Sequence, residues 1–178
     1  MSVTIPNNVT DIGHNAFAYC TSLMSMMIGN GVTRIKFDVF GNCTRLTNVT
    51  IPNSVTSIEE DAFYNCIRLK SVTIPNSVTS IGYGAFENCS ALTSVTIPDS
   101  VMDIKYHGFF NCNNLKNMTF QGKTLEEVKS MSYYPWGIKD ESIIKADDEL
   151  NESKHDRLIQ YWAHMLDECF HKDVPSDS

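Results

Sequence analysis

Cysteine has the widest chemical repertoire of the residues in this chain, and its spacing is regular. Cysteines recur at intervals of 23 residues, at Cys20, Cys43, Cys66, Cys89 and Cys112, and Cys169 stands apart. Zinc motifs place cysteines roughly two to four residues apart, so this spacing fits none of them. Copies stacked about 4.8 Å apart would bring the Cα atoms within disulfide range, but parallel side chains keep the Cβ atoms too distant for good geometry. We predict a structural ladder of packed, unpaired thiols, which suits a reducing compartment.

Histidine offers acid–base chemistry. His14 and His107 lie in separate loops, and the pattern gives neither of them a matched carboxylate partner. A catalytic histidine needs a nucleophile or a substrate proton within hydrogen-bond reach. The sequence also contains no Gly-rich phosphate loop. We therefore expect no catalytic residue, no cofactor and no enzymatic activity.

An acidic run offers oxygen ligands for a cation. The run is Glu59–Asp61, and Asp38 precedes its last residue by one 23-residue interval. Hard cations take such ligands, but no metal-loop motif accompanies them. We expect Lys36 to neighbour Glu59 and favour a solvated, charged edge, so no metal site is predicted.

The elements that must position these residues repeat along the chain. A 23-residue unit begins at Ser2, Ser25, Asn48, Ser71 and Ser94, and a truncated copy, NMTF, begins at Asn117. In the SVTIP segment apolar and polar residues alternate, which predicts a half-buried strand that the proline ends. The apolar residues form columns, most clearly Phe17, Phe40, Phe63, Phe86 and Phe109.

One copy cannot bury its own apolar face, whereas stacked copies place each column residue over its equivalent. We predict a mainly β repeat solenoid of five and a half copies over residues 2–121. A parallel sheet would cover one face, with short 3₁₀ or irregular turns elsewhere. The second copy has Gly29–Gly31 in place of PNS, which indicates either local flexibility or a partner contact.

The pattern L-x-x-V-x-I-P-x-x-V-x-x-I-x-x-x-A-F-x-x-C resembles the BspA-like (Treponema pallidum type) class of leucine-rich repeat over residues 2–116. Residues 122–145 resemble the C-terminal closing segment common in bacterial and phage members. The resemblance implies a binding role, because such proteins are mostly surface adhesins or interaction modules without a shared catalytic site.

The ends of a solenoid expose core and normally need caps. Residues 122–146 are predicted to close the C-terminal end, with a capping box of Thr124 and Glu127 that starts a helix to about Met131. Tyr133, Tyr134, Pro135, Trp136 and Ile138 would then fold over the last layer. The first strand has an uncovered edge, which predicts a homodimer through that edge or through the tail.

Residues 147–172 have the pattern of an amphipathic helix, with Trp162 and Met165 on its apolar stripe. This helix either docks on the flank of the solenoid or pairs with a second copy or a partner. His164, Glu168 and His171 share one of its faces, which fits a metal site or, as we favour, an exposed polar face. Residues 173–178 are predicted to fray.

Composition and charge narrow the function classes. No run approaches the roughly 20 apolar residues of a membrane span, and the N-terminal segment has no secretory pattern, so we expect a cytoplasmic protein without a membrane partner. The net charge is −7, and residues 117–178 hold seven Lys/Arg against thirteen Asp/Glu. Such an acidic region argues against direct nucleic-acid binding.

Partner contacts are expected where residues depart from the repeat columns. A ridge of aromatic anchors beside charge consists of Phe37, Glu60, Tyr83 and Tyr106. Met24 and Met27 border the outward-facing Ser and Thr side chains of the predicted strands. Trp162 and Met165 lie on the predicted tail helix. The leading hypothesis is a non-catalytic protein-binding module. The alternatives are a cell-surface adhesin and a phage-encoded inhibitor whose acidic C-terminal region occupies a nucleic-acid-handling host defence protein.

Overall fold

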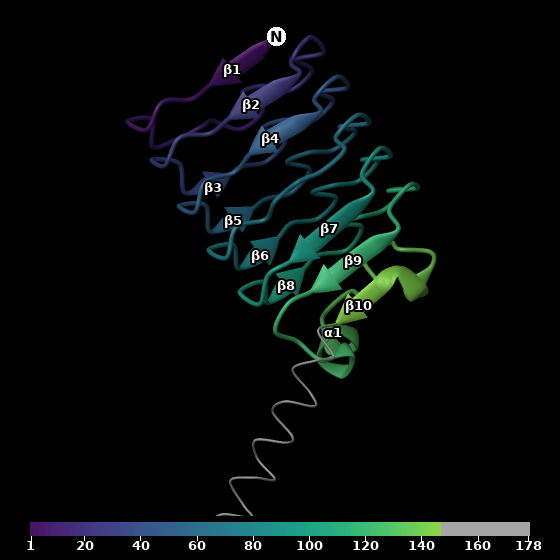
Figure 1. The fold of residues 1–178 in the computed structure, drawn as a ribbon. Helices are drawn as coiled ribbons and strands as arrows, with labels where there is room; N and C mark the ends of the chain where they lie inside the picture. Colours follow the sequence, from purple (N-terminus) through teal and green to yellow (C-terminus); the bar gives the residue numbers. More distant parts are fainter. Residues whose placement is uncertain (147–178) are drawn as a thin grey trace, which may run out of the picture.

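The computed structural model describes residues 1–146, which wind into a solenoid of stacked turns. Figure 1 shows the turns following one another from β1 at one end to α1 and β10 at the other. The predicted mainly β repeat solenoid is confirmed. No helix within residues 1–146 is both long and apolar enough to cross a bilayer. The predicted tail helix with Trp162 and Met165, the group of His164, Glu168 and His171, Cys169 and the end at 173–178 lie outside the described residues.

The segments that open each repeat form the first face of the solenoid. One parallel sheet contains β1 (Ser2–Thr4), β2 (Ser25–Met27) and β4 (Asn48–Thr50), and a second contains β7 (Ser94–Ile97), β9 (Asn117–Phe120) and β10 (Ile144–Ala146). Strand partners such as Val3 and Met26 are 23 residues apart, so equivalent side chains lie over one another.

The predicted single sheet on this face is interrupted at residues 71–74, which form no strand. The backbone ladder is stretched there: the bonds from Lys70 N to Thr47 O and from Thr93 N to Lys70 O are both 3.4 Å. The equivalent bonds from Thr47 N to Met24 O and from Lys116 N to Thr93 O are 2.9 Å.

A further parallel sheet, which the sequence analysis did not predict, runs along the next face. It contains β3 (Arg34–Ile35), β5 (Ser57–Ile58), β6 (Ser80–Ile81) and β8 (Asp103–Ile104). Each strand buries its isoleucine and turns the preceding residue outward. Two residues are too few to produce a recognisable alternation in sequence; the ladder forms because stacking brings neighbouring turns to hydrogen-bond distance.

The phenylalanine column forms the centre of the core. Its ring centroids are 5.7 Å apart for Phe17 and Phe40, and 5.2 Å apart for each later pair through Phe109. Phe40, Phe63, Phe86 and Phe109 are fully buried, whereas Phe17 in the first turn is partly exposed. Burying one such ring contributes about 1.5–3 kcal/mol, so the repeated column is a large part of the folding energy.

Residues 122–146 close the last turn. The side chain of Thr124 accepts a hydrogen bond from Glu127 N and the Glu127 carboxylate accepts one from Thr124 N, so the predicted capping box at the start of α1 (Leu125–Ser130) is confirmed. Trp136 is fully buried against Phe120, and its carbonyl accepts a hydrogen bond from Phe109 N. The short 3₁₀ helix η1 (Glu141–Ile143) then leads into β10.

Tyr133 departs from the prediction that it would cover the last layer. Its side chain is 55% exposed, its backbone has a φ of 60°, and its ring lies 6.4 Å from that of Tyr106. The left-handed backbone at this residue belongs to the turn that follows α1. Tyr133 therefore extends the aromatic ridge of the repeats.

Candidate functional site

The cysteine ladder is part of the core packing. Cys43, Cys66, Cys89 and Cys112 are buried, Cys20 is partly exposed, and all five are unpaired. Cys66 Sγ donates a hydrogen bond of 3.2 Å to Phe40 O, and the other buried cysteines make the equivalent contact one turn apart. Burial raises the pKa of Cys43 to about 11 and that of Cys112 to about 12. These thiols are protonated at neutral pH, and a protonated thiol is a poor nucleophile and a poor metal ligand.

The predicted aromatic ridge follows the sheet of β3, β5, β6 and β8. After each of these strands the chain turns through a left-handed residue: Asp38, Asp61, Gly84 and His107 have φ values of 53–60°. Asp, Gly and His are among the residues that adopt this conformation most readily. The residue before each turn is exposed, which produces the ridge of Phe37, Glu60, Tyr83 and Tyr106.

The ridge contains two groups of rings with a carboxylate between them. Phe37 lies 6.4 Å from His14, whereas Tyr83 lies 6.0 Å from Tyr106, which in turn neighbours Tyr133. Glu60 separates the two groups along the column. The structure thus brings three tyrosines together on the C-terminal side of Glu60.

A groove of about 660 Å³ lies against these tyrosines. Tyr83, Tyr106 and Tyr133 line it with 43%, 50% and 55% of their surfaces exposed, and Gly82 lies between them and the strands that bury Ile58 and Ile81. Exposed aromatic rings beside an apolar hollow are typical of binding surfaces.

One repeat lacks a side chain where the groove lies. Gly82 occupies the place that Glu59 holds one turn before and Lys105 one turn after. A Cβ atom at Gly82 would lie 2.4 Å from the carbonyl carbon of Glu59, so the backbones of the two turns approach closely at this point. The backbone of the preceding turn therefore fills the place of a side chain at Gly82, and the hollow lies outside this backbone, bordered by the tyrosine rings.

Ion pairs border the groove at both ends. Arg34 binds Glu59 at 2.6 Å, and Lys105 binds Asp103 at 2.5 Å. The Nζ atom of Lys105 also lies 5.8 Å from the ring centroid of Tyr133. Glu60 lines the groove and forms no ion pair with any residue in the described part of the chain.

Lys36 and Glu59 follow paired residues of β3 and β5 and are neighbours in adjacent turns, but they form no ion pair with each other. Lys36 binds Asp11 at 2.6 Å, while Arg34 is the partner of Glu59. In both pairs a residue contacts one that lies two places further along in the following turn. This diagonal pairing follows from extended backbone, in which side chains two residues apart point the same way.

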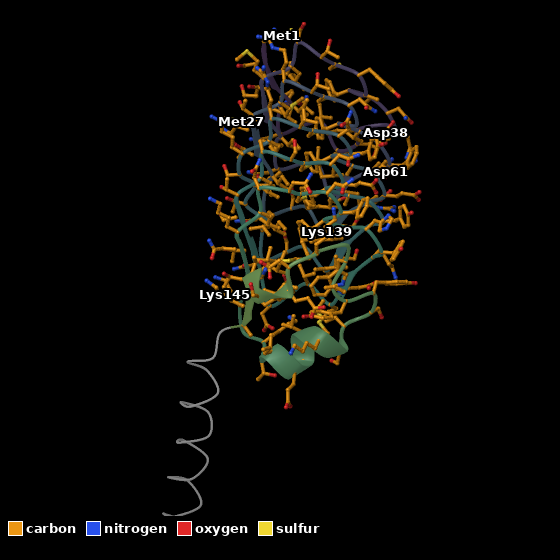
Figure 2. All side chains as sticks on the ribbon, turned by 90° about the vertical axis from the view of Figure 1, so that its right-hand side faces the viewer. Met1, Met27, Asp38, Asp61, Lys139 and Lys145 are labelled. Atoms are coloured by element: carbon orange, nitrogen blue, oxygen red, sulfur yellow. The ribbon has the colours of Figure 1, made fainter. Side chains whose placement is uncertain are left out.

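Acidic residues gather behind the ridge, and Figure 2 shows Asp38 and Asp61 on the same side of the solenoid. Burial raises the pKa of Asp61 to about 6, and the nearby carboxylates of Glu60, Glu87 and Asp38 add to this. Within residues 1–146 no three His, Cys, Asp or Glu side chains are grouped so that they could hold a metal ion. Asp38, Asp61 and Glu87 therefore place carboxylates close to Glu60 on the ridge.

His107 has a carboxylate neighbour, contrary to the prediction. Its Nδ1 atom lies 3.6 Å from Glu87 Oε2. The imidazole stacks between the rings of Tyr106 and Phe110, with centroids 3.9 and 4.4 Å away. These contacts hold the ring of Tyr106 in place on the ridge.

Met24 and Met27, which were also predicted to contact a partner, lie outside the tyrosine groove. Met24 and Met27 are exposed, and Figure 2 places Met27 on the side opposite Asp38 and Asp61. Beside Met27, a second groove of about 570 Å³ runs past Gly29, which stands where neighbouring repeats have proline. A Cβ atom at Gly29 would lie 2.6 Å from Ile5 O, so close packing of the turns explains this glycine. The methionines and the tyrosines form separate surfaces.

The sequence did not indicate that Gly82, Lys105 and Tyr133 would line a groove. Gly82 could have been found, because a glycine interrupts a column that holds charged side chains in three other repeats. Tyr133 gave no such signal, since it lies outside the repeat and reaches Tyr106 only through the path of the cap.

Comparisons with known proteins agree with this architecture. The family profile described as "BspA type Leucine rich repeat region" matches residues 1–116 and 33–153, in six copies. A leucine-rich cell surface protein from Faecalibacterium prausnitzii is 32% identical, with a TM-score of 0.71 over 74% of this chain and 35% of that one. This chain thus spans about a third of the length of that relative.

Two further solved structures share the fold. The leucine-rich repeat protein of T. pallidum has a TM-score of 0.68 at 22% identity, over 82% of this chain and 68% of that one. A leucine-rich repeat protein from Bacteroides ovatus has a TM-score of 0.58 at 27% identity, over 68% and 42% of the two chains. The comparison with curated proteins gave no match. With six copies of the repeat matched over more than half of its length, the chain belongs to the BspA-type leucine-rich repeat family.

Proposed function

We propose that this chain is a non-catalytic protein-binding module and that the tyrosine groove is its contact surface. Membership of a leucine-rich repeat family is consistent with a protein-binding or surface-protein role. The observation that carries the proposal is the alignment of exposed Tyr83, Tyr106 and Tyr133 over one apolar hollow. Tyrosine is enriched among the residues that dominate binding energy at protein interfaces.

The backbone of the solenoid holds the ridge in a fixed conformation. The ridge is held by backbone hydrogen bonds from turn to turn, such as Gly84 N to Tyr106 O at 3.2 Å and Asp61 N to Tyr83 O at 2.9 Å. A surface ordered before binding loses little entropy when a partner docks. A partner segment that lies along the ridge would contact several successive turns.

Quantitative capture from lysate tests the proposal. The bait proteins are the wild type, the groove variant Tyr83→Ala/Tyr106→Ala, and the control Tyr19→Asn. Tyr19 is 70% exposed and lies outside the groove, and the other four full repeats carry Asn at that place, so the control removes an exposed ring without disturbing the fold. We expect the wild type and Tyr19→Asn to retain a partner that the groove variant loses. If all three retain the same proteins, the groove is not the contact surface.

A surface-protein role is the second candidate. It is favoured by the similarity to a protein described as a leucine-rich cell surface protein. The unpaired thiol ladder instead favours the reducing cytoplasm. Immunodetection in surface and cytosolic fractions of the producing cells separates the two locations: protein accessible to antibody on intact cells supports the adhesin, and protein found only after lysis contradicts it.

A finer version of the binding function is supported by charge alone. Residues 117–178 carry seven Lys/Arg against thirteen Asp/Glu. This balance suits a basic, nucleic-acid-handling surface on a host defence protein, which a phage-encoded inhibitor would occupy. Electrostatic contacts weaken as salt screens them. A captured partner that dissociates at high salt and loses its nucleic-acid binding supports the idea, and a salt-insensitive partner contradicts it.

A further inference from the structure

The tyrosine groove has one end that already holds a cation and one that does not. At the C-terminal end, Lys105 lies over the ring of Tyr133 and is held by Asp103. At the other end, Glu60 has no ion-pair partner among residues 1–146, and no Lys or Arg of that range lies over the ring of Tyr83. The contact between a cation and a tyrosine ring that Lys105 makes at one end therefore has no counterpart among residues 1–146 at Glu60 and Tyr83.

At Gly82 the wall of the groove carries no side chain, whereas the equivalent places one turn before and after carry Glu59 and Lys105. A side chain from a partner would place its aliphatic stem at Gly82 beside the tyrosine rings and its polar end beside Glu60. Arginine combines an apolar stem with a planar cation that stacks on aromatic rings and pairs with carboxylates.

Charge complementarity selects a cation for this position. Lys105, the basic residue that lines the groove, is engaged by Asp103, and Arg34 is engaged by the lining residue Glu59. Asp38, Asp61 and Glu87 add negative charge near Glu60, and the pKa of Asp61 is raised to about 6 by burial and by these neighbours. Glu87 also faces His107 at 3.6 Å. An anionic side chain would meet repulsion here, whereas a cation supplies the missing charge.

We propose that the groove recognises an arginine side chain on a protein partner, with the aliphatic stem at Gly82 and the guanidinium between Glu60 and the ring of Tyr83. This inference rests on the proposed protein-binding function, since it specifies what that groove binds. It makes Glu60 and Tyr83 the residues that set specificity, while Tyr106 and Tyr133 supply contact area.

The test is a titration of the full chain, carrying ¹³C-labelled tyrosine rings, with acetyl-Ala-Arg-Ala-amide, followed by NMR. The matched peptide contains citrulline, which keeps the shape of arginine without its charge. We expect saturable shifts of the Tyr83 ring signals, with binding of the citrulline peptide at least about fivefold weaker, because citrulline loses both the cation–π contact and the charge that pairs with Glu60. A lysine peptide should fall between the two, because its ammonium cannot stack as a plane.

Two variants locate the contact. Glu60→Gln keeps the shape of an exposed side chain and should weaken arginine binding by up to about fivefold, the range for losing one exposed ion pair. The control Glu126→Gln removes an exposed carboxylate on α1, outside the groove lining, and should leave binding unchanged. Equal binding of the arginine and citrulline peptides, equal effects of the two variants, preferential binding of a glutamate peptide, or no saturable shift up to about 20 mM peptide would each overturn the proposal.

The experiments distinguish a groove that binds no protein from a groove that binds protein without a preference for arginine. If the groove variant Tyr83→Ala/Tyr106→Ala loses its captured partner but the peptides show no preference for arginine, the groove binds protein through other chemistry and only the arginine assignment falls. If the groove variant keeps every partner, the proposed function falls as well.

Discussion

Replacing one ring of the phenylalanine column tests how the solenoid is stabilised. Phe63 is fully buried between Phe40 and Phe86, with both centroid distances 5.2 Å and interplanar angles of 16° and 5°. Phe17 has one ring neighbour in the column, at 5.7 Å, and is partly exposed in the first turn. Phe63→Ala therefore removes more packing contacts than Phe17→Ala, although both substitutions delete the same ring.

Phe63→Ala should lower the free energy of unfolding by about 3–5 kcal/mol, the range for removing a buried aromatic ring. Phe17→Ala should cost about 2 kcal/mol, because roughly half of the contacts are lost and solvent fills the space. A difference of about 2 kcal/mol corresponds to roughly 4–8 °C in melting temperature for a chain of this size.

Urea unfolding followed by far-UV circular dichroism measures both free energies, with Phe63→Leu as the control that keeps most of the volume and should cost about 1 kcal/mol. Because solenoid turns contact only their neighbours, a broader transition for Phe63→Ala would mean that the array has split into two unfolding units. Equal losses for Phe63→Ala and Phe17→Ala would refute the reasoning that each ring is stabilised by its neighbours above and below.

Three further outcomes are expected. The pKa of Asp61 is raised above its unfolded value to about 6, so the folded state binds its proton more tightly and stability falls as pH rises from about 4 to about 6. Asp61→Asn, which also tolerates the φ of 54°, should therefore be more stable than wild type at pH 8 and gain less at pH 4, as thermal melts at both pH values will show. In a Cys169→Ser background, Ellman's reagent should modify Cys20 in the folded protein and all five ladder thiols after unfolding; rapid native reaction of more than one thiol would contradict their burial. Within residues 1–146 the outer edge of β1 is unpaired, so we predict self-association of this 178-residue chain through it; light scattering should give twice the monomer mass, and Thr4→Pro should shift the mass toward the monomer.

The repeat itself could be predicted because its information is local and periodic. Column residues such as Phe63 and Leu69 return every 23 positions, and only a stack of equal turns buries all of them at once. The capping box at Thr124 was likewise predictable, since both of its hydrogen bonds join residues three apart.

Contacts between turns were less predictable. The sequence suggested that Lys36 and Glu59 would meet because they share a column, yet the ion pairs run diagonally to Asp11 and Arg34. The Glu87–His107 contact has the same origin, since its partners come from adjacent turns and different columns. Side-chain direction and turn-to-turn offset set these pairs, and neither can be read from spacing.

The sequence alone thus determined the solenoid, its core and the exposed ridge that includes Glu60, Tyr83 and Tyr106, because burial of apolar columns allows one arrangement. The tertiary structure decided that part of this ridge borders a groove. Gly82 lies there between two filled places, and the cap brings Tyr133 back beside Tyr106. Residues of several turns and of the cap surround the groove, so it forms only when these distant segments of the chain are packed together.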